Sequence, residues 1–290
     1  MTKYKGLFFF LFPLSLLFLS LIFREAAILG VKRGWDICVE GALPALFPAL
    51  VLSGFLRSLP VRGRLRLFLP LLMGLVCGFP VGAHIVAEGY RQGIFRKKEA
   101  ERLLLLTNGI SPAFFIGFCG EAVLGDVRKG WFLWGVQSLV SLVLFCLFFG
   151  KARGYSNHIE SKENVPNLAD NIILALKKAI HSFLYIVSCI LFFSFLSYLI
   201  PAILKQGAGF RLIISLLFEV TGGVGNLKEV SSHYAFPLCA AACGFGGLSS
   251  HLQVMGALLQ TNLSSKFYLI GKVFFAIFMA ASAIIFQNLL

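Results

Sequence analysis

The chain has little charge, and the charge it has is divided unevenly between the two signs. Of its 290 residues only 13% are Asp, Glu, Lys or Arg, and 13 acidic residues stand against 26 basic ones, for a net charge of +13. Soluble domains carry about 25% charged residues, so a water-soluble globular protein is excluded. The hydrophobic fraction of 58% indicates an integral membrane protein.

Motifs of the common catalytic sites are also missing. The sequence has no G-x-S-x-G nucleophile elbow, no H-E-x-x-H metal motif, no Walker A loop and no acidic cluster to hold Mg²⁺ with phosphate. We therefore expect no enzyme, no cofactor and no transport powered by a nucleotide site on this chain. An intramembrane enzyme and a structural or signalling membrane protein are the alternatives from other classes.

The basic residues and the cysteines have ordinary explanations. The basic residues are scattered through short connections without an exposed aromatic platform, so no nucleic-acid partner is expected. All seven cysteines fall in or beside apolar segments, as small buried residues do. Cys239 and Cys243 are four residues apart, but no second pair with zinc-like spacing accompanies them, so no metal site is predicted.

Several stretches are apolar and long enough to cross a bilayer, which takes about 20 residues. They are Gly6–Phe23, Ile37–Leu56, Trp131–Phe149, Ser182–Ile200 and Phe267–Phe286. The first resembles a signal peptide, but the following "REAAILGVKRG" offers no small-residue cleavage site, and we interpret it as a retained span. The distribution of Lys and Arg over the connections places the N-terminus in the cytoplasm.

The polar stretch from Lys151 to Asp170 divides the chain into two halves that look alike. Each half has a Cys-Gly-Phe break in an apolar segment, at Cys77–Phe79 and at Cys243–Phe245. A histidine follows each break, at His84 and at His251, which are 167 residues apart. The predicted units are an N-terminal transmembrane helix and loop (1–36), a first repeat (37–150), a polar linker with an amphipathic lead-in (151–181) and a second, inverted repeat (182–290).

Glycine breaks in corresponding segments of opposite orientation are typical of transporters that bind solutes at the repeat interface near the bilayer midplane. Irregular backbone at membrane depth needs protein or a water-filled cavity to satisfy its polar groups. We therefore predict an all-α polytopic membrane protein with an inverted-repeat transporter fold, two re-entrant helical hairpins and broken helices.

In the first half, Leu65–Tyr90 is expected to be a hairpin with its tip near Pro80. The tip exposes N–H groups at the start of the returning helix, where anions bind readily. The following "TNGISP" predicts an unwound span. Its Asn108 and Ser111 either face a substrate or satisfy the freed backbone groups.

In the second half, Glu219 lies in the glycine-rich "FEVTGGVG". An ionisable residue within a membrane segment indicates a functional site, and Glu219 either couples transport to a proton or cation or pairs with a basic residue. The polar residues Ser249, Ser250, His251 and Gln253 gather after the bend at Gly246 and Gly247, which indicates a cavity. His251 taken alone is more typical of a packing histidine.

The segments "GFPVGAHIVAEGYRQGIFRKKEAERLLLLTNGISPAFFIGF", "FEVTGGVGNLKEV" and "CGFGGLSSHLQVMGALL" together resemble the YlbJ family of sporulation integral membrane proteins, over about 43–120 and 182–275. That family belongs to the group with the nucleoside recognition, or Gate, domain, and the last segment is also similar to concentrative nucleoside transporters. The resemblance implies a transporter of dipicolinic acid across the outer forespore membrane. It also implies the substrate-facing positions Gly78, Pro80, Gly82, Asn108, Ser111, Pro112, Glu219, Thr221, Gly246, Gly247, Ser249, Ser250 and Gln253.

Dipicolinate is a small planar dianion, and two hairpin N-termini would each face one of its carboxylates. Glu219 would repel the dianion unless it is protonated or paired with a cation, so a coupling ion is expected there. The chain is shorter than typical family members and has His84 where a lysine-like residue is more usual. Another carboxylate or a nucleoside therefore stays open as substrate, as does a homo-oligomeric state.

Overall fold

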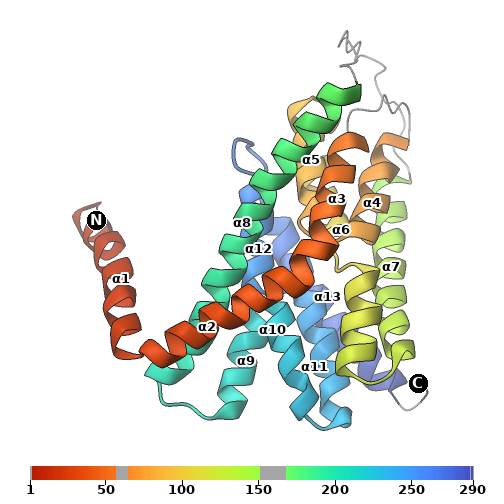
Figure 1. The fold of residues 1–290 in the computed structure, drawn as a ribbon. Coiled ribbons are helices and arrows are strands. Elements are labelled where there is room, and N and C mark those ends of the chain that lie inside the picture. The colour runs from red at the N-terminus through yellow and green to blue at the C-terminus, as the bar shows by residue number, and fades with distance from the viewer. Residues whose placement is uncertain (1, 57–64, 151–167, 288, 290) are drawn as a thin grey trace.

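The computed structural model describes residues 2–56, 65–150, 168–287 and 289, and this part of the chain is helical nearly throughout, without strands (Figure 1). The all-α prediction is confirmed. The helices are α1 (Thr2–Ile22), α2 (Arg24–Asp36), the π-helix η1 (Ile37–Ala42), α3 (Leu43–Leu56), α4 (Leu65–Cys77), α5 (Val81–Arg91), α6 (Lys97–Thr107), the π-helix η2 (Phe114–Val123), α7 (Val127–Phe149), α8 (Leu168–Ile203), α9 (Ala208–Phe218), α10 (Val220–Gly225), the 3₁₀-helix η3 (Asn226–Glu229), α11 (Ser232–Phe245), α12 (Gly247–Ala257) and α13 (Lys266–Phe286).

Within the described residues, four helices are long and apolar enough to cross a membrane: Val127–Phe149, Ala169–Ile203, Ser232–Ala257 and Lys266–Phe286. A fifth span results if Phe10–Ile22 and Arg24–Ala42, which meet at 103°, count as one bent pair. Three of the expected spans, 131–149, 182–200 and 267–286, lie inside α7, α8 and α13.

The N-terminal region differs from the prediction. The expected loop at 24–36 is helix α2, which runs on through η1 into α3 and packs against α8. Gly30 and Gly34 make this packing possible, because a Cβ at Gly30 would lie 2.9 Å from the Phe195 Cα and one at Gly34 would lie 2.9 Å from the Ser194 Cβ. Small residues of this kind let membrane helices approach closely. α1 leaves this body at a sharp angle (Figure 1).

The boundary expected between 181 and 182 falls within the single 36-residue helix α8. The polar linker at 151–167 lies outside the described residues.

The first break forms the expected pair of helices. α4 and α5 pack against each other on either side of the turn at 78–80, where Gly78 has a φ of +73°. α6 packs against both. The close approach depends on Gly82, because a Cβ there would overlap the backbone carbonyl of Thr107. The re-entrant placement of this pair in a membrane stays a prediction.

The second hairpin lies elsewhere than predicted. α9 and α10 pack against each other on either side of Glu219, with Gly223 close to the backbone of Leu216. α11 and α12, in contrast, form one candidate span from Ser232 to Ala257, interrupted at Gly246. The prediction of a hairpin at Cys243–Phe245 is therefore wrong: a left-handed Gly246 with a φ of +93° breaks the helical hydrogen bonding but does not turn the chain back.

Each half thus has a hairpin followed by a broken helix. In the first half α4 and α5 precede the break between α6 and η2, and in the second α9 and α10 precede the break between α11 and α12. The first hairpin lies in the upper part of the view in Figure 1 and the second in the lower part. Hairpins at opposite ends are what an inverted repeat requires, and the inverted relation itself stays a prediction.

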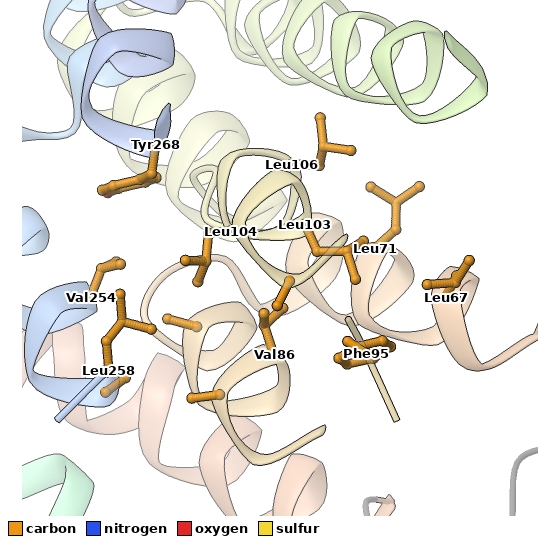
Figure 2. Close-up of a cluster of buried hydrophobic side chains, with 14 of the residues drawn as sticks. Leu67, Leu71, Val86, Phe95, Leu103, Leu104, Leu106, Val254, Leu258 and Tyr268 are labelled. Atoms are coloured by element: carbon orange, nitrogen blue, oxygen red, sulfur yellow. The ribbon is translucent and has the colours of Figure 1, made fainter. Parts of the chain in front are cut away.

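The two halves pack directly against each other. Figure 2 shows an apolar cluster in which Leu71 of α4, Val86 of α5 and Leu104 of α6 gather with Val254 of α12 and Tyr268 of α13. All five side chains are fully buried. This cluster fixes the first hairpin and α6 against α12 and α13 of the second half.

Candidate functional site

A cavity of about 800 Å³ lies where the α6–η2 break of the first half meets the α9–α10 hairpin and α12 of the second. Its walls come from α2, η1, α3, the turn of the first hairpin, the α6–η2 break, η2, α8, the α9–α10 hairpin, η3 and α12. Its polar and charged wall residues are Arg33, Asp36, Glu40, Ser111, Ser194, Ser197, Tyr198, Ser215, Glu219, Thr221, Asn226, Lys228, Glu229, Ser250 and Gln253.

Both π-helices border this cavity. η1 contributes Ile37, Glu40 and Gly41, and η2 contributes Gly117 and Phe118. A π-helical turn inserts a residue into an α-helix and is found frequently at functional sites. These turns could not be predicted, because neither segment carries a local sequence pattern that distinguishes a π-helix from an α-helix.

Asn108 holds the first hairpin against the α6–η2 break. Its Oδ1 accepts a hydrogen bond from the Ala83 amide (3.0 Å), and its Nδ2 donates to the Leu104 carbonyl (2.7 Å). At the tip, the Phe79 amide donates to the Gly109 carbonyl (2.9 Å). Asn108 is fully buried and is not part of the cavity wall. Of the two expected roles, the geometry favours satisfaction of the freed backbone groups.

Gln137 of α7 secures the same break, and the sequence analysis did not identify it. Its Oε1 accepts from the Ile110 amide and its Nε2 donates to the Ile110 carbonyl, both at 2.9 Å. Gln137 is 1% exposed and Ile110 is 2% exposed. One side chain therefore replaces both backbone hydrogen bonds that Ile110 loses where the helix is unwound.

Glu219 plays a related part at the second hairpin. Its Oε1 accepts from the Thr221 amide (3.2 Å) and its Oε2 from the Gly222 amide (2.6 Å), so the carboxylate caps α10. Glu219 is 4% exposed and lies in the cavity wall. The N–H groups at the start of the second helix of each hairpin were expected to be free for a substrate. Instead, an amide of α5 donates to Asn108, and two amides of α10 donate to Glu219.

Helix α12 brings two polar residues to the cavity. The Ser250 hydroxyl lies 2.8 Å and 2.9 Å from the carbonyl oxygens of Gly246 and Gly247, to which it donates. The Gln253 Nε2 donates to the Ser249 hydroxyl oxygen at 3.2 Å. The Gln253 Oε1 is buried without a hydrogen-bond partner among the described residues, although the side chain lines the cavity.

His251 packs between aromatic side chains. Its Nδ1 lies 3.0 Å from the Tyr268 hydroxyl, and its ring contacts the rings of Phe245 and Tyr268 edge to face. It is not part of the cavity wall.

The predicted site residues thus divide into two groups. Ser111, Glu219, Thr221, Ser250 and Gln253 line the cavity. The remaining positions form the breaks or pack behind the wall: Gly78, Pro80, Gly82, Asn108, Pro112, Gly246, Gly247, Ser249 and His251.

The cavity wall carries both signs of charge. Arg33 of α2 and Lys228 of η3 are exposed basic residues of the wall, and within the described residues neither forms an ion pair. Asp36, Glu40 and Glu229 are acidic residues of the wall. An anion that enters the cavity therefore has cationic partners, but it also needs the acidic charges to be screened or neutralised.

No protein-family model matches the chain, and no solved structure matches it. Among curated proteins, the chain is similar to the sporulation integral membrane protein YlbJ of Bacillus subtilis (strain 168). The two are 23% identical over an alignment of 307 residues including gaps, and this alignment covers 88% of this chain and 75% of that protein. The chain is thus a membrane protein related to a sporulation integral membrane protein. The likeness to the Gate domain and to concentrative nucleoside transporters stays a prediction.

Proposed function

We propose that the chain is a transporter of a small anionic solute and that the cavity is its binding site. The observation that carries the proposal is that the α6–η2 break of the first half and the α9–α10 hairpin and α12 of the second border one cavity. Discontinuous helices around a central site are the architecture of many secondary transporters. We propose, as part of this function, that the two halves form an inverted repeat and that the fold is of the Gate type.

The relationship to a sporulation protein makes dipicolinate the first solute to test, carried across the outer forespore membrane during endospore formation. The cavity volume of about 800 Å³ lies within the usual range of small-molecule sites, about 300–1,000 Å³. Arg33 and Lys228 supply one positive charge for each carboxylate, and a guanidinium binds a carboxylate through paired hydrogen bonds. The wall hydroxyls of Ser111 and Thr221 add donors.

Glu219 is proposed as the coupling site for a proton or a cation. In the wall it would repel a dianion while ionised, and its two oxygens also hold the start of α10. Protonation or cation binding at Glu219 removes the repulsion and weakens the bonds to the hairpin at the same time. Solute binding and hairpin movement are thereby linked through one carboxyl group.

A nucleoside is the second candidate, and one observation favours it. The Gln253 Oε1 lines the cavity without a partner among the described residues, and it is an acceptor. A nucleobase or ribose offers N–H or O–H donors to such a group, whereas the dipicolinate dianion offers acceptors alone.

The test is uptake of labelled dipicolinate by proteoliposomes under imposed proton or sodium gradients. We expect uptake above empty vesicles and at least about a tenfold loss in the double variant Arg33→Gln with Lys228→Gln, because a hydrogen bond to a charged group contributes about 1.5–3 kcal/mol. Lys98→Gln, an exposed position on α6 away from the cavity, is the matched control.

The other outcomes separate the alternatives. An absence of dipicolinate uptake under every gradient overturns this substrate, and uptake of uridine in the same vesicles then selects the nucleoside. A chemically altered product indicates an intramembrane enzyme. Absence of any flux, together with a stable protein partner, indicates a structural role.

A further inference from the structure

Three buried thiols meet between η2 and α11. The Sγ atoms of Cys119, Cys239 and Cys243 all lie within 4.8 Å of one another, and those of Cys119 and Cys243 are 3.7 Å apart. All three side chains are fully buried, and none of them lines the solute cavity. We call these residues the thiol cluster.

The cluster joins two distant parts of the sequence. Cys239 and Cys243 lie one turn apart on the same face of α11, as residues at i and i+4 do. The third thiol comes from the π-helix η2, 124 residues before Cys243. No metal site was predicted from the sequence, because Cys239 and Cys243 alone supply two ligands; the fold adds Cys119 as the third.

The distances suit a metal ion in the plane of three sulfurs. Thiolate sulfurs bind a first-row metal ion at about 2.3 Å, which places three sulfurs in a trigonal plane about 4 Å from one another. The observed separations, 3.7 Å for one pair and no more than 4.8 Å for the others, already agree with that spacing. Ion binding therefore requires only rotation of side chains and small shifts.

The surroundings determine which charge the cluster tolerates. Phe115, Leu133 and Met279 belong to the same apolar core, where unpaired thiolates would be costly. Lys272 is 2% exposed and lies on α13, which packs against the helix α11 that carries Cys239 and Cys243. A bound monovalent cation together with a protonated Lys272 offsets two of the three thiolate charges.

We propose that the thiol cluster is a binding site for monovalent copper. Soft thiolate ligands select Cu(I), zinc or iron–sulfur clusters over oxygen-preferring ions such as Mg²⁺ or Ca²⁺. Structural zinc sites are almost always four-coordinate. Among the described residues, the group has three cysteine ligands and no His, Asp or Glu as a fourth, which favours Cu(I) over zinc. Binding displaces thiol protons to solvent, and copper keeps its oxidation state.

Occupancy of the site ties the first half of the chain to the second. Cys119 follows the α6–η2 break, and Cys243 precedes the break at Gly246 by three residues. An ion shared by η2 and α11 resists separation of the two broken helices. Because the ion binds the folded chain, it also raises the thermal midpoint of unfolding.

The experiment is an anaerobic titration of the purified, detergent-solubilised chain with Cu(I) in competition with a chromophoric Cu(I) chelator. One variant keeps the thiol cluster and replaces Cys38, Cys77, Cys146 and Cys189 by Ala. The matched variant keeps those four and replaces the three cluster cysteines. We expect one Cu(I) per chain in the first variant and none in the second, with the thermal midpoint raised by copper in the first alone.

X-ray absorption at the copper edge of the unmodified chain makes the test independent of whether the variants fold. Three sulfur neighbours at about 2.3 Å support the proposal. Nitrogen or oxygen neighbours, equal copper loading of the two variants, or tighter binding of Zn²⁺ than of Cu(I) in the same competition would overturn it.

Discussion

The hydrogen bonds of Gln137 to Ile110 allow the account of the first break to be tested quantitatively. The substitution Gln137→Met keeps a side chain of similar length and removes both hydrogen bonds. The Ile110 amide and carbonyl then stay buried without their partner, since Ile110 is 2% exposed. A buried polar group left unsatisfied costs about 1–3 kcal/mol, so the two groups together should lower the free energy of unfolding by about 2–6 kcal/mol.

The measurement is reversible unfolding in mixed micelles with increasing sodium dodecyl sulfate, followed by circular dichroism and tryptophan fluorescence. Ser138→Ala is the matched control, because the neighbouring Ser138 hydroxyl has no hydrogen-bond partner among the described residues. Surface substitutions usually change the free energy of unfolding by less than about 0.5 kcal/mol. If Gln137→Met loses no more than that, and no more than Ser138→Ala, the reasoning is refuted.

A second variant tests whether the side chain at position 137 must both accept a hydrogen bond from Ile110 and donate one to it. In Gln137→Glu, an ionised carboxylate still accepts from the Ile110 amide but repels the Ile110 carbonyl. A protonated carboxyl both donates and accepts, as the amide does. Acidification should therefore restore stability to Gln137→Glu relative to the unmodified chain, and a stability difference that is independent of pH would contradict the paired geometry.

Three further predictions concern the hairpins. Asn108→Ala should lower stability by about 1–3 kcal/mol, because the Ala83 amide loses its partner; the same unfolding titration measures this. Gly82→Ala should destabilise more than Gly135→Ala, because a Cβ at Gly82 overlaps the backbone of α6 whereas nothing lies within 4 Å of one at Gly135; comparable midpoints would contradict the close packing. Glu219→Gln keeps a neutral side chain with a single acceptor, so dipicolinate uptake should lose its dependence on the ion gradient, and an unchanged dependence would remove this residue as the coupling site.

The apolar helices and the points where they break could be predicted from the sequence, because both depend on residues that are close together along the chain. Apolar length predicted spans that lie inside α7, α8 and α13. Glycine and proline at 78–82 and Asn-Gly at 108–109 predicted the points where helices end. Each of these signals acts within a few residues.

Whether a break turns the chain back could not be predicted in the same way. Cys77–Phe79 and Cys243–Phe245 have the same three residues, yet the first lies at a hairpin turn, whereas the second ends α11 within a span that continues as α12. The difference comes from packing, since α5 returns along α4 and lies against α6. A spacing shared by two motifs does not report which neighbours each will meet.

The long-range polar contacts were hidden for the same reason. Gln137 and Ile110 are 27 residues apart, and Cys119 and Cys243 are 124 apart. A single glutamine or cysteine in an apolar helix carries no sign of its partner. The sequence placed polar residues near the cavity, at Glu219 and Gln253, because a polar side chain in an apolar segment is costly unless it is used.

The central claim is that the α6–η2 break of the first half and the α9–α10 hairpin of the second enclose one solute cavity, and substituted cysteines test it most directly. Ser111→Cys lies in the wall contributed by the first half and Thr221→Cys in the wall contributed by the second. Their reaction with a small maleimide in proteoliposomes, corrected for the unmodified chain, should be slowed by dipicolinate at both positions. If dipicolinate protects neither position, or protects one and leaves the other unchanged, the two halves do not share a binding site.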